Sequence, residues 1–159
     1  MQTIRIVAVG KLKEDYWRRA VQEYQKRLSA FCKLEVVEVE EYRLGNNPSD
    51  AMIQRAIEEE GESLSKKLLP QGITVSLCIE GKMLTSPELA HLLEQSSLRS
   101  SQMNFVIGGS YGLSEKVKTR SDYRLSMSPM TFPHQMARVM VCEQIYRGMS
   151  INAHTKYHK

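Results

Sequence analysis

The sequence predicts one α/β domain with a mostly parallel sheet covered by helices. Three observations support this prediction. Apolar runs of strand length alternate along all 159 residues with stretches whose apolar residues recur every three or four positions. The first run, Ile4 to Val9, is almost continuously apolar, as in a strand buried on both faces of a parallel sheet. No internal repeat or change of composition divides the chain, so residues 1–159 are expected to form a single domain.

The elements follow one another in a regular strand–helix order. The predicted strands are residues 3–10, 33–42, 73–79, a run that starts at 104, and 123–128. The predicted helices are residues 14–29, a second from Ser49 or Asp50 to Pro70, a third from Ser86, a short one capped by Ser114, and a last one through Met149. The alternating pattern of 33–42 places that strand near a sheet edge.

Local signals refine two of the helices. Ser86 followed by Pro87 predicts an N-cap and first helical position, and the residues from Ser96 to Gln102 have the composition of a polar loop. In the second helix, Glu58–Glu60 is a charge run that predicts a solvated face rather than a metal site. These signals fix where the helices begin better than where they end.

Composition and charge exclude several classes of protein. Apolar residues make up 42% and charged residues 25%, as in an ordinary globular domain, and no apolar run approaches the roughly 20 residues that span a bilayer. The N-terminal apolar run is too short for a signal peptide, so a cytoplasmic location is expected. The three cysteines have no CxxC spacing, which argues against a disulfide framework or thiolate metal site. The net charge of +4 permits nucleic-acid binding without requiring it.

A glycine-rich junction follows the fourth strand, within Phe105–Leu113. Adjacent Gly108 and Gly109 permit a tight reversal that brings backbone N–H groups close to a ligand, and the following helix could present an anion-binding N-terminus. The pattern is not GxGxxG, so the dinucleotide fingerprint is absent. Two interpretations stay open: a turn that contacts a ligand, and a strand-to-helix turn without one.

A second junction follows the fifth strand, within Leu125–His134. Pro129 and Pro133 fix two φ angles and remove two N–H donors. The hydroxyl and apolar side chains between them suit a polar ligand in an apolar pocket: Ser126, Met127, Ser128, Met130, Thr131 and Phe132. The alternative is a rigid connection whose methionines and phenylalanine only pack.

The last helix begins at His134. A helix N-terminus disfavours a charged imidazolium, so a neutral imidazole there is suited to act as a base, although such a residue also caps helices. Arg138 lies one turn on, placed either to contact a phosphate or carboxylate or to pair with an acidic neighbour. Glu143 and Arg147 have the spacing of a structural i, i+4 pair. The helix is apolar over more than one stripe, which a homodimer interface or a central core position would explain.

The chain ends in a short tail without periodicity. His154 and His158 have HxxxH spacing, but no helical pattern or third ligand accompanies them, so no metal is expected. Tyr157 lies between Lys156 and His158, a mixture suited to stacking on a base and touching phosphates. A frayed terminus is the alternative.

Six motifs together resemble the ribosomal RNA large subunit methyltransferase H family, whose members are SPOUT-class enzymes. The motifs are Gly10-Lys11, Ile79–Leu84, Phe105–Leu113, Met130–Arg138, Glu143–Arg147 and Tyr157–Lys159. The match covers essentially the whole chain in order and spacing. Two positions depart from the pattern: Tyr111, where a smaller or more polar residue is expected, and Pro129, an uncommon residue in its loop.

The resemblance implies a fold, a cofactor and a substrate. The α/β fold would contain a deep C-terminal trefoil knot, and S-adenosylmethionine would bind in a bent shape inside it. The implied cofactor contacts are Leu77, Gly108, Met127, Ser128, Pro129, Met130, Thr131 and Phe132. The enzyme would be a homodimer that acts on the ribosome and methylates N3 of a pseudouridine in helix 69 of 23S ribosomal RNA.

The implied chemistry assigns further residues. N3 of pseudouridine is a weakly acidic imide that must lose its proton before it attacks the methyl group. His134 and His158 are candidate bases, and Arg138 is a candidate to stabilise the imide anion or hold a phosphate. Arg138, His154, Tyr157 and His158 are the candidate RNA contacts.

Two other functions remain as rivals. A transferase with a nucleotide donor would also use the paired glycines, but the chain shows no base or metal constellation for it. A non-catalytic RNA-binding module suits the basic charge and the tail, yet it does not explain the second junction. Binding of S-adenosylmethionine discriminates among the three.

Overall fold

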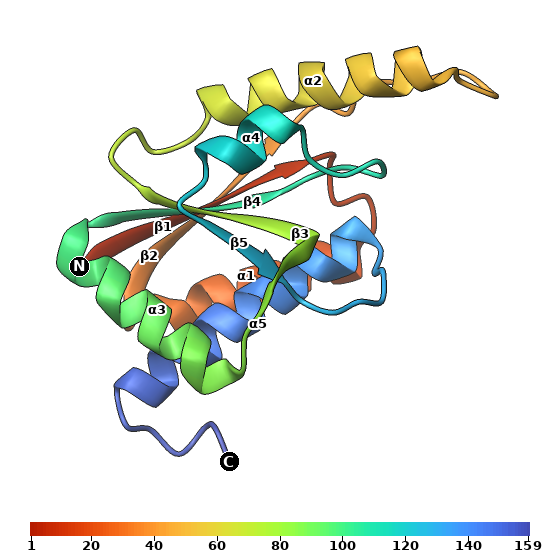
Figure 1. Ribbon diagram of the computed structural model, residues 1–159. Helices are drawn as coiled ribbons and strands as arrows, with labels where there is room; N and C mark the ends of the chain where they lie inside the picture. Colours follow the sequence, from red (N-terminus) through yellow and green to blue (C-terminus); the bar gives the residue numbers. More distant parts are fainter.

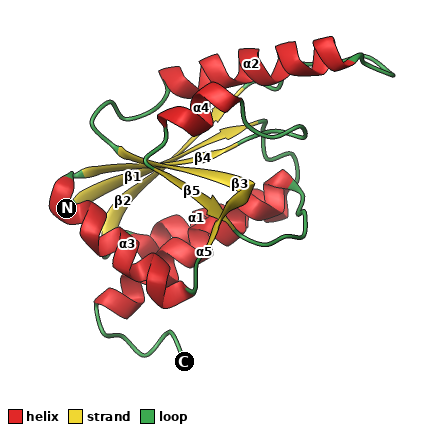
Figure 2. Cartoon of the chain, viewed as in Figure 1, coloured by secondary structure: helices red, strands yellow, loops and turns green.

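The computed structural model describes residues 1–159 as three layers, with a sheet between two sets of helices (Figures 1 and 2). The elements in chain order are β1 (Gln2–Val9), α1 (Asp15–Leu28), β2 (Cys32–Val39), α2 (Asp50–Lys66), β3 (Ile73–Met83), α3 (Ser86–Arg99), β4 (Gln102–Ile107), α4 (Glu115–Arg120), β5 (Tyr123–Ser126) and α5 (His134–Asn152). The predicted β-α order is therefore confirmed.

The five strands lie in the order β2-β1-β4-β3-β5, and every neighbouring pair is parallel. The first strand thus pairs with β4, and residue Thr3 lies opposite Gln102. Helices α1, α3 and α5 cover one face of the sheet, and α2 and α4 cover the other (Figure 1). Strand β2 lies at an edge, as its alternating sequence predicts.

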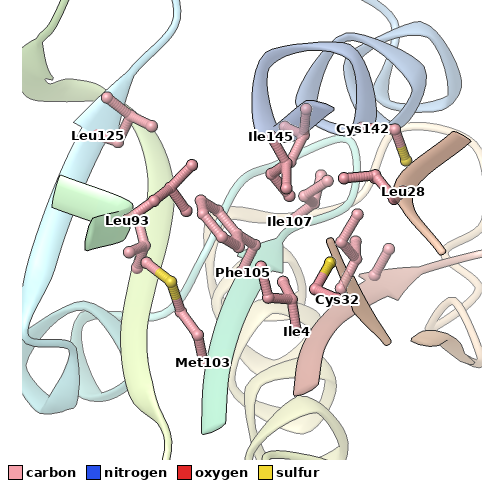
Figure 3. Packing of buried hydrophobic residues seen from close by; sticks show 14 of the residues in the cluster. Ile4, Leu28, Cys32, Leu93, Met103, Phe105, Ile107, Leu125, Cys142 and Ile145 are labelled. Atoms are coloured by element: carbon pink, nitrogen blue, oxygen red, sulfur yellow. The ribbon is translucent and has the colours of Figure 1, made fainter. Parts of the chain in front are cut away.

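Side-chain alternation along the central strands builds a core on each face. Ile4 and Ile6 of β1 pack toward α1, α3 and α5 with Phe105 of β4, and Figure 3 shows Ile4 and Phe105 beside Ile145 of α5. Val7 of β1 belongs to the second core, with residues of α2 and α4. Full burial of such a side chain stabilises the fold by roughly 1.5–3 kcal/mol. The continuous apolar run of β1 therefore serves two interfaces at once.

The helix caps agree with the sequence prediction at two of three places. Ser49 and Ser114 cap α2 and α4 as predicted. The cap of α3 is Thr85 rather than Ser86, because Thr85 and Glu88 form a capping box. Helix α3 continues to Arg99, four residues into the stretch from Ser96 to Gln102 that was predicted as a polar loop, and Gln102 begins β4. The prediction holds only for Ser100 and Ser101, because Ser96 lies on the buried face of the helix, which composition does not reveal.

Strand β3 is longer than predicted because it contains a bulge. Leu77 and Lys82 both lie opposite Leu125 of β5, so residues 78–81 bulge out of the ladder. A Cβ on Gly81 would lie 2.8 Å from the backbone N of Leu125, a separation that no side chain permits. Glycine at this position therefore lets β3 continue along β5 beyond the bulge.

Glu58 and Glu59 of α2 are exposed, as the prediction of a solvated face requires, but Glu60 is not. Its residue is only 8% exposed, and one carboxylate oxygen accepts a hydrogen bond from the backbone N–H of Tyr42 at 3.0 Å. The other oxygen lies 3.2 Å from the position a Cβ on Gly109 would take. Burial raises the pKa of Glu60. This carboxylate therefore connects α2 to the segment after β2 and lies against the glycine turn after β4.

None of the helices combines the length and the apolar character that a bilayer-spanning segment needs.

The buried carboxylate gives a pH-dependent prediction for Glu60→Gln. Because the folded protein holds the carboxyl proton more tightly than the unfolded chain, wild-type stability is lost as pH rises from the ordinary carboxyl value of about 4.3 through the raised one. Glutamine removes this charge and keeps an oxygen for the N–H of Tyr42. Urea unfolding should show the variant gaining free energy of unfolding relative to wild type as the pH rises above about 4.3.

The exposed neighbour Glu59 provides the matched control. Glu59→Gln should leave the pH profile of stability unchanged. A constant difference between Glu60→Gln and wild type across this pH range would contradict the buried-charge account.

Candidate active site

One cavity of about 440 Å³ gathers the two junctions at the carboxyl ends of the strands. Its wall comes from the end of β3, the turn after β4, the segment that starts in β5, and the first turn of α5. Strand β3 leads to α3 on one face of the sheet and strand β4 to α4 on the other (Figure 1). A crevice at such a divergence of connections is where open α/β sheets bind ligands.

The structure places seven of the eight expected cofactor contacts on this wall. They are Leu77, Gly108, Met127, Ser128, Met130, Thr131 and Phe132. Pro129, the eighth, is exposed and is not part of the lining. Tyr111, one of the two departures from the family pattern, also lines the cavity and is 51% exposed. Residues that are 55 positions apart in sequence therefore meet at a single site.

The glycine turn after β4 is closed by its own backbone. The N–H of Gly112 donates to the carbonyl of Gly109 at 3.1 Å, and Gly112 has a φ of +86°, in the left-handed region. A Cβ on Gly108 would lie 2.7 Å from the carbonyl carbon of Gly112. The turn therefore requires glycine at position 108. Because its glycines have no side chains, the backbone itself forms this part of the cavity wall.

The short helix after this turn adds no anion site. The hydroxyl of Ser114 accepts from the N–H of Val117 at 3.2 Å, and Glu115 places a carboxylate in the first turn. The contribution of the first junction to the cavity is the turn itself, and the expectation of an anion-binding helix end is not supported.

Two hydrogen bonds between residues close in sequence shape the segment after β5. The hydroxyl of Ser126 donates to the carbonyl of Ser128 at 3.2 Å, and the N–H of Met130 donates to the hydroxyl of Ser128 at 3.0 Å. The side chain of Met130 is left 71% exposed at the cavity. Ser126 and Ser128, which the sequence predicts as ligand contacts, therefore also stabilise the loop that carries the apolar wall.

His134 is the first residue of α5 and lines the cavity. Helix α5 has Pro133 as its N-cap, with no side-chain cap, so His134 does not cap its own helix. The ring Nε2 lies 3.7 Å from the position a Cβ on Gly10 would take, and Gly10 has a φ of +88°. No hydrogen bond within the chain engages the imidazole. A half-buried ring with free nitrogens at a cavity wall is suited to proton transfer.

Arg138 lies one turn beyond His134 but points away from the cavity. Its side chain has no exposed surface, and its guanidinium pairs with Glu38 at 2.6 Å. It also donates to the carbonyls of Gly10 at 3.0 Å and Val9 at 3.3 Å. Burial lowers the pKa of Arg138, and the hydrogen bond to Glu38 opposes that effect. Of the two arrangements open from sequence, the structure has the one in which Arg138 pairs with an acidic residue.

The tail packs on the far part of α5 in the same chain. The hydroxyl of Tyr157 donates to Glu143 at 2.9 Å, its ring meets Tyr146 edge-on at 4.7 Å, and His158 Nδ1 lies 3.2 Å from Arg147. The Glu143–Arg147 pair forms as predicted, at 2.7 Å. His158 therefore contacts a helical position 13 residues from His134, about 20 Å along the axis. The two histidines of one chain do not share a site.

His154 follows α5 in a left-handed conformation, with a φ of 57°, and is exposed. It does not line the cavity.

Sequence reasoning missed the part of the wall that the bulge in β3 provides. Cys78, Ile79 and Glu80 line the cavity, together with Lys118 of α4. Lys118 pairs with Glu80, which raises the pKa of Lys118 and lowers that of Glu80. The Glu80-Gly81 sequence after an apolar run was the only local signal, and Lys118 had none.

The position of Arg138 predicts a large effect of Arg138→Met on stability. The substitution leaves two buried carbonyls without this donor and removes the ion pair of Glu38, which should cost at least about 2 kcal/mol of unfolding free energy. Urea unfolding measures it. Arg19→Met is the control, because Arg19 forms an exposed pair with Asp15 and should cost no more than about 0.5 kcal/mol. Equal stabilities of the two variants would contradict the structural role.

Comparison with known protein families identifies the family of the chain. A family model described as "Predicted SPOUT methyltransferase" matches residues 1–158, which is nearly the whole chain. The five-stranded parallel sheet flanked by helices agrees with the fold of that family. The chain belongs to the SPOUT methyltransferase family.

Proposed function

We propose that this protein transfers a methyl group from S-adenosylmethionine to N3 of a pseudouridine in helix 69 of 23S ribosomal RNA. The observation that carries the proposal is the free imidazole of His134 on the wall of the cavity formed by the two junctions. SPOUT methyltransferases generally use this cofactor and act on RNA. The motifs from Gly10 to Lys159 support the choice of ribosomal RNA. The proposal also places the protein in the cytoplasm, where ribosomes lie.

The residues of the cavity fit the proposed cofactor. Pockets for small ligands measure roughly 300–1,000 Å³ and combine apolar walls with a few polar groups, as this one does. Leu77, Met127 and Phe132 would hold the adenine, and the backbone at Gly108 would approach the ribose. Glu80 and Lys118 form an ion pair on the wall, and on opening this pair would offer one charge of each sign to the zwitterionic amino-acid end.

The chain's own groups would handle the proton. When bound, the cofactor supplies a methyl group that its sulfonium already activates. His134 would accept the proton of N3, so that the nitrogen lone pair is free to form the new N–C bond as the C–S bond breaks. Because the methyl group needs no further activation, much of the rate would come from holding N3 in line with it. Arg138 would act indirectly, by fixing the helix turn that carries His134.

The active form would be a homodimer. Within one chain, Tyr157 and His158 contact the far part of α5, so they would reach a cavity only in a second copy. Tyr157 and His154 of the tail would then contact the RNA, and His158 would assist at N3. The half-buried Met140 and the exposed Met136 on α5 would contribute to the interface.

The trefoil knot belongs to the same proposal. Its support is that the segments after β4 and after β5 line one cavity, and that α5 then returns to the ends of β1 and β2.

Cofactor binding is tested by calorimetry with S-adenosylmethionine. Wild-type protein should bind it, and Gly108→Ala should bind at least about tenfold more weakly, or about 1.4 kcal/mol, because the added Cβ forces the turn away from Gly112. Gly45→Ala is the control, since a Cβ there meets nothing within 4 Å. Failure of the wild-type protein to bind would favour the two rival functions.

Proton transfer is tested by methylation of ribosomes at saturating cofactor. His134→Ala should lower turnover by about 100-fold or more, the usual contribution of a general base, and leave cofactor affinity near wild type. Deletion of residues 154–159 should abolish RNA methylation without loss of cofactor binding. Unchanged turnover in His134→Ala, His158→Ala and Arg138→Ala would overturn the assignment. Mass spectrometry of 23S RNA from a strain without the protein identifies the methylated nucleotide.

A further inference from the structure

A second groove, of about 580 Å³, lies beyond the bulge of β3. It is bordered by the last residues of β3, by β5 and by α3. Six of its lining side chains are basic, aromatic or apolar, namely Lys82, Leu84, His91, Leu92, Tyr123 and Arg124. None of them lines the cofactor cavity.

The groove carries more positive than negative charge. Lys82 and Arg124 are exposed, and neither forms an ion pair in the chain. The one carboxylate of the lining, Glu88, accepts a hydrogen bond from the hydroxyl of Thr85 at 3.0 Å in the capping box of α3. Arg99 lies next to the groove and donates to the hydroxyl of Tyr123 at 3.2 Å. Two unpaired cations and one carboxylate leave the lining with a net positive charge that attracts an anion.

The floor of the groove is apolar and two rings border it. Leu84 and Leu92 are half-buried there, and Tyr123 and His91 supply planar side chains. Cations beside planar and apolar side chains are the combination by which proteins bind single-stranded nucleic acid, with phosphates on the charges and bases on the rings. A simple anion would use only the cations.

The groove adjoins the cofactor cavity along two strands. Arg124 of β5 lines the groove, and Met127, the first residue after β5, lines the cavity. Three residues of extended chain span about 10 Å. On β3, Glu80 lines the cavity and Lys82 the groove, on either side of Gly81. Stacked nucleotides advance about 3.4 Å each, so a few of them would bridge the two sites.

We propose that this groove binds the single-stranded RNA segment next to the nucleotide that enters the cofactor cavity. Lys82 and Arg124 contact its phosphates, and a base stacks on Tyr123. This subsite rests on the proposed RNA methyltransferase function. The tail of a second copy is the other candidate occupant, but its Lys156 and Lys159 carry the same sign of charge as the groove.

The test measures binding of a labelled RNA stem-loop with a pseudouridine in its loop. The double variant Lys82→Gln/Arg124→Gln should bind at least about tenfold more weakly at low salt. Its plot of log affinity against log salt should be shallower by about 1.4, because each phosphate contact on a single strand contributes about 0.7. Arg55→Gln/Lys66→Gln removes two exposed charges from α2 on the opposite face and should keep the wild-type slope.

Stacking is tested separately at Tyr123. Tyr123→Leu should weaken RNA binding by about fivefold or more, whereas Tyr123→Phe, which keeps the ring, should bind as wild type does. Equal affinities of the leucine and phenylalanine variants would overturn the stacking contact.

Three results would overturn the subsite. They are wild-type affinity and salt slope in Lys82→Gln/Arg124→Gln, competition by polyglutamate as effective as that of unlabelled RNA, and conversion of the double variant from dimer to monomer in light scattering. Calorimetry with S-adenosylmethionine should give wild-type affinity in every groove variant. Failure of the wild-type protein to bind the cofactor would instead overturn the proposed function.

Discussion

The buried guanidinium of Arg138 is the contact on which the geometry of the site depends. It joins the first turns of α5 to two backbone carbonyls at the carboxyl end of β1 and to the side chain of Glu38 of β2. Glu38 also accepts from the backbone N–H of Leu12, at the start of the segment that leaves β1. Since α5 follows directly on the segment after β5, fixing its start also fixes where that segment can lie. His134 and the apolar wall are therefore positioned by a charge that does not itself line the cavity.

Local pattern predicted much of the fold, and distant contacts account for what it missed. The five strands and the caps Ser49 and Ser114 follow from periodicity and capping chemistry, which act over a few residues. The burial of Arg138 depends on a partner 100 residues away, and that of Glu60 on the segment after β2 and the glycine turn. Neither has a local sequence signal.

The bulge in β3 gives two adjoining sites to one pair of strands. Leu77 at the start of the bulge and Cys78 and Glu80 within it line the cavity of the two junctions, and Lys82 after it lines the groove. Gly81 makes the change possible because only a residue without a Cβ fits against the backbone of β5. Chemistry and substrate recognition would then occupy neighbouring stretches of the same rigid sheet. Sites on such elements hold their geometry better than sites on loops.

The pairing of β1 with β4 has a consequence for synthesis of the chain. One edge of β1 pairs with β2, which follows soon after it in the sequence. The other edge pairs with β4, which begins at Gln102, almost a hundred residues later. At 5–20 residues per second, that edge stays open for roughly 5–20 s after β1 is made. An unpaired apolar strand is a template for association with other chains. Folding of this protein therefore has a vulnerable interval whose length is set by the position of β4 in the sequence rather than by stability.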